Sequence, residues 1–130
     1  NVEEAQRMLK TESRDVKDLM KQLMSYGPKL IIITDNTEGA YMYDGEHFYH
    51  VPMYPDPRPA FDRTGCGDAF ASTFVSALAM GKAPLEAFMW APVNPMSVAQ
   101  FVGAQEGLLT LEQLEWWLQR APAEFKPKEI

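Results

Sequence analysis

Apolar residues recur at helical spacing near the start of the chain and then form one continuous run. Residues 2–9 are helix-prone, and a second helix is predicted from the spacing of Val16, Leu19, Met20, Leu23 and Met24. A Gly-Pro pair at 27–28 should end this helix, because glycine favours the C-cap and proline cannot continue a helix. Residues 30–33 are uniformly apolar and mostly β-branched, which predicts a strand covered on both faces.

The next segment predicts a β-hairpin, the strongest local signal in the chain. Residues 34–38 are polar and should form a loop, whereas 40–43 and 47–51 are rich in aromatic and apolar residues. Asp44-Gly45 lies between these two runs and favours a primed turn. Four prolines between positions 52 and 59 are incompatible with regular structure, so we expect an extended connector there.

The remaining residues are predicted to be helical. A helix over 68–80 should end at Gly81, and Pro84 suits the first turn of the next helix. Pro92 and Pro95 should break or kink that helix before a further helical segment at 97–102.

The end of the chain contains a second loop and a last helix. Residues 103–107 are expected to form the loop, and Thr110-Leu111-Glu112-Gln113 is a capping box that opens a helix through Leu118. Residues 121–130 contain two prolines and are expected to be a loosely attached tail after a domain that spans 1–120. The order of helix, strand, hairpin and helices predicts an α/β layered fold.

The stretch Asp62-Arg63-Thr64-Gly65-Cys66-Gly67-Asp68 carries the clearest chemistry. Glycines permit backbone conformations in which consecutive N–H groups converge on one point, and the helix that follows adds its positive N-terminal end. This combination is typical of an anion site, and Asp68 would be a carboxylate held beside the bound anion. A base next to an anion cradle is what phosphoryl transfer to a hydroxyl requires.

Composition limits the possible partners. The 130 residues carry a net charge of −6 and show no Lys/Arg cluster, so we expect no nucleic-acid surface. The apolar runs are too short to span a membrane, and no signal peptide is visible. The single cysteine allows no internal disulfide, which suits a reducing cytoplasm. The first residue, Asn1, is not a methionine, which suggests a piece of a longer protein.

The same motif resembles the second signature of the ribokinase-like (PfkB) carbohydrate kinases, D-T-x-G-A-G-D. Three further segments are similar to landmarks of that family and occur in the family's order. They are Asn1-Val2-Glu3-Glu4 for N-x-x-E, residues 30–40 for a strand followed by T-x-G-x-x-G, and Gly103-Ala104-Gln105 for a late G-A-Q loop. The resemblance implies a ribokinase-like layered fold in which this chain is the C-terminal, nucleotide-binding half, with strands and a β-hairpin packed against helices.

The resemblance also implies roles for particular residues. Asp68 would be the catalytic base for the sugar hydroxyl, and the backbone of Gly65, Cys66 and Gly67 would form the anion hole for the transferred phosphoryl group. Nucleotide contacts are implied for Thr34, Asn36, Gly39, Asn94 and Gly103. Asn36 replaces the usual first glycine of its motif, Cys66 replaces alanine, and Thr73 replaces alanine or glycine.

Metal ions are implied at two places. Asn1 and Glu4 would help to order Mg²⁺ near the phosphates of ATP, and Asp62 corresponds to a monovalent-cation position in many relatives. Arg63 adds a positive charge beside Asp62, and Gly107 offers no side-chain oxygen, so we do not predict a functional potassium site.

Three functions remain open from the sequence. The first is phosphoryl transfer from ATP to a sugar or nucleoside hydroxyl, feeble in the isolated chain because family members are about twice as long and their N-terminal half supplies most of the sugar pocket. The second is a truncated, non-enzymatic module that binds the missing half or another copy of itself. The third is a thiol hydrolase in which His47 or His50 activates Cys66.

Overall fold

The computed structural model describes all 130 residues, and these form two compact units. Unit 1 comprises residues 1–52 and 127–130, and unit 2 comprises residues 53–126. None of the helices combines the length and apolar character that crossing a lipid bilayer requires.

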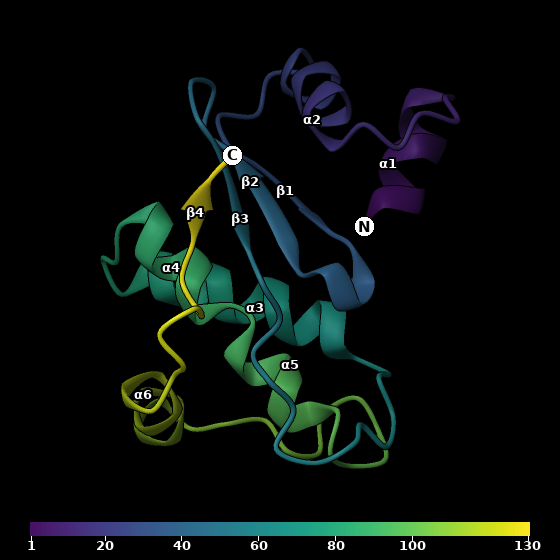
Figure 1. Cartoon of the computed structure of the whole chain (residues 1–130). Helices are drawn as coiled ribbons and strands as arrows, with labels where there is room; N and C mark the ends of the chain where they lie inside the picture. Colours follow the sequence, from purple (N-terminus) through teal and green to yellow (C-terminus); the bar gives the residue numbers. More distant parts are fainter. The chain divides into compact units, whose positions relative to one another are not determined.

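Unit 1 is a four-stranded antiparallel sheet with two helices packed against it (Figure 1). Its elements are α1 (Val2–Leu9), α2 (Val16–Met24), β1 (Ile31–Thr34), the 3₁₀ helix η1 (Asn36–Glu38), β2 (Ala40–Tyr43), β3 (Phe48–Val51) and β4 (Lys128–Glu129). The strands follow the order β1-β2-β3-β4. Both predicted N-terminal helices are therefore confirmed, and the strand predicted over 30–33 is shifted by one residue.

The core of unit 1 lies between α1, α2 and β1. Val2 and Ala5 of α1, Leu19 and Met20 of α2 and Ile33 of β1 form one buried apolar cluster. The other three residues of β1 are only half-buried. This strand is thus less covered than its uniformly apolar sequence predicts, and it lies at the edge of the sheet with β2 as its one neighbour.

The predicted hairpin is confirmed as β2 and β3, which pair antiparallel from Ala40↔Val51 to Tyr43↔Phe48. The Asp44 carboxylate accepts hydrogen bonds from the N–H groups of Glu46 (2.9 Å) and His47 (2.7 Å). Gly45 alone in this loop has a positive φ, +99°, whereas a type I′ turn requires a positive φ at both central residues.

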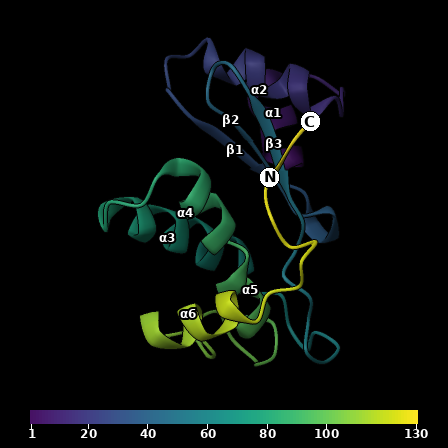
Figure 2. The same cartoon turned by 60° about the vertical axis from the view of Figure 1, so that its left-hand side comes forward.

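Unit 2 is helical, with α3 packed against both α4 and α5 and with α6 against α5 (Figure 2). Its helices are α3 (Cys66–Ala79), α4 (Pro84–Trp90), α5 (Val93–Val98) and α6 (Leu111–Gln119). Phe88, Val93 and Val98 are fully buried between them. The predicted capping box at Thr110 and Gln113 is present at the start of α6.

Two predictions about unit 2 need correction. The helix expected at 97–102 is instead α5, which begins at Val93 and ends at Val98. Pro92 is its N-cap and Pro95 lies in its first turn, where a missing N–H costs no intrahelical hydrogen bond. The motif helix α3 begins at Cys66, two residues before the expected start, because Gly65 occupies the N-cap.

Residues 121–130 differ from the loosely attached tail that was expected. Phe125 is 2% exposed and packs edge-on against the ring of Tyr54 at 4.8 Å between centroids. Further on, β4 pairs with β3 through His50↔Lys128 and Tyr49↔Glu129. A buried aromatic residue and a strand pairing therefore hold this segment.

Candidate functional site

Gly65 is required where the motif loop turns into α3. Its φ is +80°, a conformation that L side chains rarely adopt, and it is the N-cap of the helix. A Cβ atom at this position would lie 2.6 Å from the backbone of Ala104. By contrast, a Cβ atom at Gly67 would meet nothing within 4 Å, so no other part of the protein fills the space next to this second glycine of the motif.

Asp68 lies in the first turn of α3, as its third residue. Its side chain is exposed, and the N-cap position belongs to Gly65, so Asp68 does not cap the helix. The carboxylate therefore stands at the positive end of a 14-residue helix and is available to accept a proton.

The Cys66 thiol lacks the properties of an activated nucleophile. Its thiol contacts the carbonyl oxygen of Pro95 at 3.5 Å, and burial raises the pKa of this thiol above the ordinary value of 9.0, although the Arg63 guanidinium partly offsets the effect. An activated cysteine needs a lowered pKa. The hydrolase hypothesis is disfavoured further because His50 Nε2 already bonds the carbonyl oxygen of Glu38 at 2.6 Å.

Asp62 ties the glycine motif to the loop at residues 103–107. One carboxylate oxygen accepts the N–H of Thr64 at 2.9 Å, and the other accepts the N–H of Gly103 at 3.3 Å. These bonds, that from Thr64 above all, hold the pKa of Asp62 below its ordinary value of 3.8. One oxygen thus stabilises the turn of the motif itself and the other joins the motif to the second loop, which is a different use from the cation ligand implied by resemblance.

Arg63 is paired with the proline-rich connector. Its guanidinium contacts Asp56 Oδ2 at 2.7 Å, and the Asp56 side chain is 18% exposed. The other oxygen, Oδ1, is buried without a hydrogen-bond partner. The charge that Arg63 brings to the motif is therefore largely balanced by Asp56.

Asn94 joins three segments of unit 2. Its Nδ2 donates to Thr73 Oγ1 at 3.0 Å, and its Oδ1 accepts the N–H of Leu109 at 2.9 Å. Asn94 also borders a groove of about 170 Å³ between α3 and the start of α6. Because both ends of the amide are already bonded, we leave Asn94 out of the nucleotide contacts proposed below.

Thr34 ends β1, and Asn36 and Gly39 lie in the loop that connects β1 to β2 in unit 1. Asn36 adopts the left-handed conformation (φ +47°) expected of a residue that replaces glycine. Gly39 has φ +99°, and a Cβ atom there would lie 2.2 Å from the carbonyl oxygen of Val51. The loop is thus a tight turn against β3, closed by the Asp35 N–H bond to the Gly39 carbonyl oxygen at 2.9 Å.

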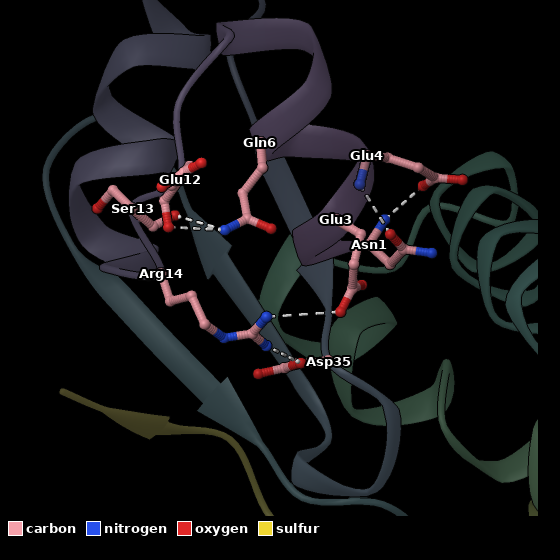
Figure 3. Close-up of polar contacts among 8 residues, drawn as sticks. All are labelled: Asn1, Glu3, Glu4, Gln6, Glu12, Ser13, Arg14 and Asp35. Atoms are coloured by element: carbon pink, nitrogen blue, oxygen red, sulfur yellow. Dashed lines mark hydrogen bonds and ion pairs between the residues drawn. The ribbon is translucent and has the colours of Figure 1, made fainter.

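Asn1 and Glu4 form a capping box at the start of α1. Asn1 Oδ1 accepts the N–H of Glu4 at 2.9 Å, and the Glu4 carboxylate contacts the backbone nitrogen of Asn1 (Figure 3). The two oxygen donors stand one helical turn apart, which fits a magnesium ion that keeps several of its waters. They do not fit a cage of protein ligands, because the chain holds no cluster of three or more acidic, histidine or cysteine side chains suited to a metal.

The predicted site residues fall into two groups. Unit 1 contains Asn1, Glu4, Thr34, Asn36 and Gly39, and unit 2 contains Asp62, Gly65, Cys66, Gly67, Asp68, Asn94 and Gly103. Within unit 2, Asp62 and Gly103 are hydrogen-bonded, and Gly65 lies close to Ala104, the neighbour of Gly103 in the chain. The Asp56–Arg63 pair and the Thr73–Asn94 bond are not predictable from the sequence, because their partners are 7 and 21 residues apart with no local pattern to link them.

Comparison with known proteins identifies a family to which the chain is similar. The model of the family described as pfkB family carbohydrate kinase matches residues 1–110. Over 84 residues the chain is 39% identical to the cytidine kinase of Thermococcus kodakarensis, which corresponds to 64% of this chain and 30% of that protein.

Solved structures show the same fold. Arabidopsis thaliana ribokinase complexed with ribose and ATP aligns with a TM-score of 0.83 at 22% identity, over 92% of this chain and 39% of that one. An E. coli protein assigned as ribokinase II, in complex with ATP and Mg²⁺, aligns with a TM-score of 0.78 at 24% identity, over 90% of this chain and 37% of that one. The expected ribokinase-like fold class is confirmed.

The chain spans between 30% and 39% of the length of these relatives. The family match extends over most of its residues and includes all four landmark motifs. The chain therefore belongs to the pfkB family of carbohydrate kinases.

Proposed function

We propose that this chain is the nucleotide-binding part of a kinase that transfers the γ-phosphoryl group of ATP to a hydroxyl of a sugar or nucleoside. The observation that carries the proposal is the start of α3. There an exposed Asp68 carboxylate follows two glycines, one of which leaves open space above the helix N-terminus. The names of the relatives, cytidine kinase and ribokinase, support a sugar or nucleoside as the acceptor.

The residues of unit 2 have distinct tasks in this reaction. The N–H groups of residues 65–67 stabilise the negative charge on the phosphoryl group, and such preorganised donors usually supply the largest catalytic contribution. Asp68 takes the proton from the attacking hydroxyl as a general base. Asp62 holds the glycine loop in position through its bonds to Thr64 and Gly103.

The residues of unit 1 bind the nucleotide. Thr34, Asn36 and Gly39 present a tight backbone turn to the phosphates. The ATP complexes of two neighbours support ATP as the nucleotide. Asn1 and Glu4 would hold Mg²⁺ through its waters, and the bound ion neutralises phosphate charge. We include no monovalent cation, and we place the reaction in the cytoplasm, where ATP is available.

The test is Asp68→Asn, assayed for transfer of radiolabelled γ-phosphate to a panel of sugars and nucleosides and, in parallel, for ATP affinity by calorimetry. We expect transfer to fall by about 10²–10⁴-fold while the Kd for ATP stays within about twofold. The matched control is Glu112→Gln, because Glu112 is an acidic residue in the first turn of another helix of unit 2. Equal loss of transfer and of ATP affinity in the Asp68 variant would refute its role as the base.

A second candidate function is a non-enzymatic module that associates with a polypeptide. The helix α3 is apolar on nearly every side, yet Val75 is 62% and Met80 at its C-cap 52% exposed, and such helices are usually buried. The partner would be the missing N-terminal half or a second copy of the chain. A concentration-dependent dimer that does not respond to ATP would favour this function over the kinase.

A further inference from the structure

Arg14 joins two segments of unit 1 that the proposed function uses separately. Its Nη1 lies 3.6 Å from Glu3 Oε1 in the first turn of α1, and its Nη2 lies 3.5 Å from Asp35 Oδ1 directly after β1 (Figure 3). Glu3 is the neighbour of Glu4, and Asp35 stands between Thr34 and Asn36. The guanidinium therefore bridges the turn assigned to Mg²⁺ and the loop assigned to the phosphates.

The segment that carries Arg14 is fixed to α1 by hydrogen bonds. Gln6 Nε2 donates to the carbonyl oxygens of Glu12 (3.0 Å) and Ser13 (3.1 Å), which pins the connection between α1 and α2 to the body of α1 (Figure 3). Lys10 ends α1 in the left-handed conformation (φ 53°), which turns the chain back toward the helix. Arginine suits such a bridge, because its planar guanidinium presents its N–H donors in a fixed arrangement.

The negative charge of Asp35 is the reason why the Arg14 bridge matters for nucleotide binding. The Asp35 side chain is only 16% exposed and lies at the beginning of the loop that would receive ATP phosphates. A carboxylate at this position repels a polyphosphate unless a cation neutralises it. Of the two acidic partners of Arg14, Asp35 is the more buried, so neutralisation matters most there.

We propose that Arg14 is a positioning residue for the nucleotide site: it fixes the first turn of α1 relative to the loop at 35–39 and neutralises Asp35 beside the phosphates. This inference rests on the proposed function, since it assigns Arg14 to the same ATP site. Arg14 acts through Glu3 and Asp35 and is not itself assigned a contact with ATP.

The first measurement is the Kd of the purified chain for Mg²⁺–ATP by calorimetry. Arg14→Gln removes the charge, and we expect an affinity loss of about tenfold or more, as is typical for residues that support ligand-binding groups. Lys29→Gln is the matched control, because Lys29 is an exposed cation in unit 1 just before β1, whereas Asp35 follows that strand. The melting temperature should change by less than about 4 °C in both variants, because exposed ion pairs contribute little to stability.

The double variant Arg14→Gln/Asp35→Asn separates neutralisation from direct phosphate binding. Removal of the Asp35 charge should restore most of the affinity that Arg14→Gln loses. A wild-type Kd in Arg14→Gln, or a loss that Asp35→Asn does not restore, would overturn the proposal.

Hydrogen exchange of the chain without ATP tests the Arg14 bridge independently of the kinase function. The N–H groups of Glu4 and Glu38 are bonded within the two bridged segments, to Asn1 Oδ1 and the Asp35 carbonyl oxygen. We expect both to exchange several-fold faster in Arg14→Gln than in Lys29→Gln. Unchanged exchange refutes the bridge. If exchange increases but the wild-type chain does not bind Mg²⁺–ATP, the proposed function fails, and with it the assignment of the bridge to a nucleotide site.

Discussion

At the scale of single residues, Gly65 and Gly67 are two positions apart in one motif but have different requirements. Gly65 has a positive φ and no room for a Cβ atom, whereas Gly67 is helical and faces open space. The sequence predicts both as parts of one anion site. The structure shows that only Gly65 is required by the fold. A substitution at Gly67 can therefore test ligand binding without disturbing the fold.

We predict that Gly65→Ala destabilises unit 2 by about 1–3 kcal/mol or more, because it adds strain and a clash with Ala104. Gly67→Ala should leave stability unchanged or raise it by up to about 1 kcal/mol, since alanine favours the helix. Its Cβ atom should nevertheless weaken the binding of ATP by crowding the anion site. Urea unfolding and calorimetry measure the two effects. Unaltered ATP affinity in Gly67→Ala would contradict the placement of the phosphoryl group at this glycine.

The Asp62 carboxylate should make the stability of unit 2 depend on acid. Its pKa is lowered in the folded chain, so its contribution is complete above the ordinary value of 3.8 and is lost as the pH falls through the lower folded value. We expect Asp62→Asn to be less stable than wild type at pH 6, and the difference to shrink below about pH 4.

Urea unfolding followed by tryptophan fluorescence measures this effect selectively. All three tryptophans, Trp90, Trp116 and Trp117, belong to unit 2, so the signal reports the unit that contains Asp62. A stability difference between Asp62→Asn and wild type that stays constant from pH 6 to pH 3 would argue against stabilisation by the hydrogen bonds that the Asp62 carboxylate accepts from Thr64 and Gly103.

At the scale of elements, the bond between Thr73 and Asn94 joins α3 to α5. Thr73 replaces the alanine or glycine of the family pattern. Its Oγ1 donates to the Ala69 carbonyl oxygen at 2.7 Å and accepts a hydrogen bond from Nδ2 of the buried Asn94. The larger side chain is therefore matched by a polar partner on the neighbouring helix.

We predict that Thr73→Ala destabilises unit 2 by about 1–3 kcal/mol, because Asn94 Nδ2 is then buried without an acceptor. Thr73→Ser retains the hydroxyl and serves as the control. Both are measured by urea unfolding with tryptophan fluorescence. Equal stability of the two variants would indicate that the hydroxyl is not what joins the helices.

The sequence predicts the elements with local signals and misses those that depend on distant partners. Apolar spacing, capping residues and the Asp-Gly turn locate α1, α2, the hairpin and α6. The bounds predicted for α5 are wrong, because Pro92 and Pro95 predict a break, whereas both fall at the start of a helix. The pairing of β4 with β3 carried no signal, because residues 128–129 are polar and their partners lie nearly eighty positions away.

At the scale of the whole molecule, the chain contains two compact units and spans well under half of the relatives it matches. The motifs proposed to bind the nucleotide lie within these residues, whereas the family resemblance implies that most of the acceptor pocket comes from the N-terminal half of longer members. Since catalysis gains much of its rate from positioning both reactants, we expect this chain to bind ATP far better than it transfers phosphate.

The most direct test of the account is calorimetric titration of the 130-residue chain with Mg²⁺–ATP. The account predicts saturable binding of one ATP per chain, retained in Asp68→Asn and weakened in Gly67→Ala. Absence of binding by the wild-type chain would contradict it, and would mean that these residues keep the ribokinase-like fold without a functional nucleotide site.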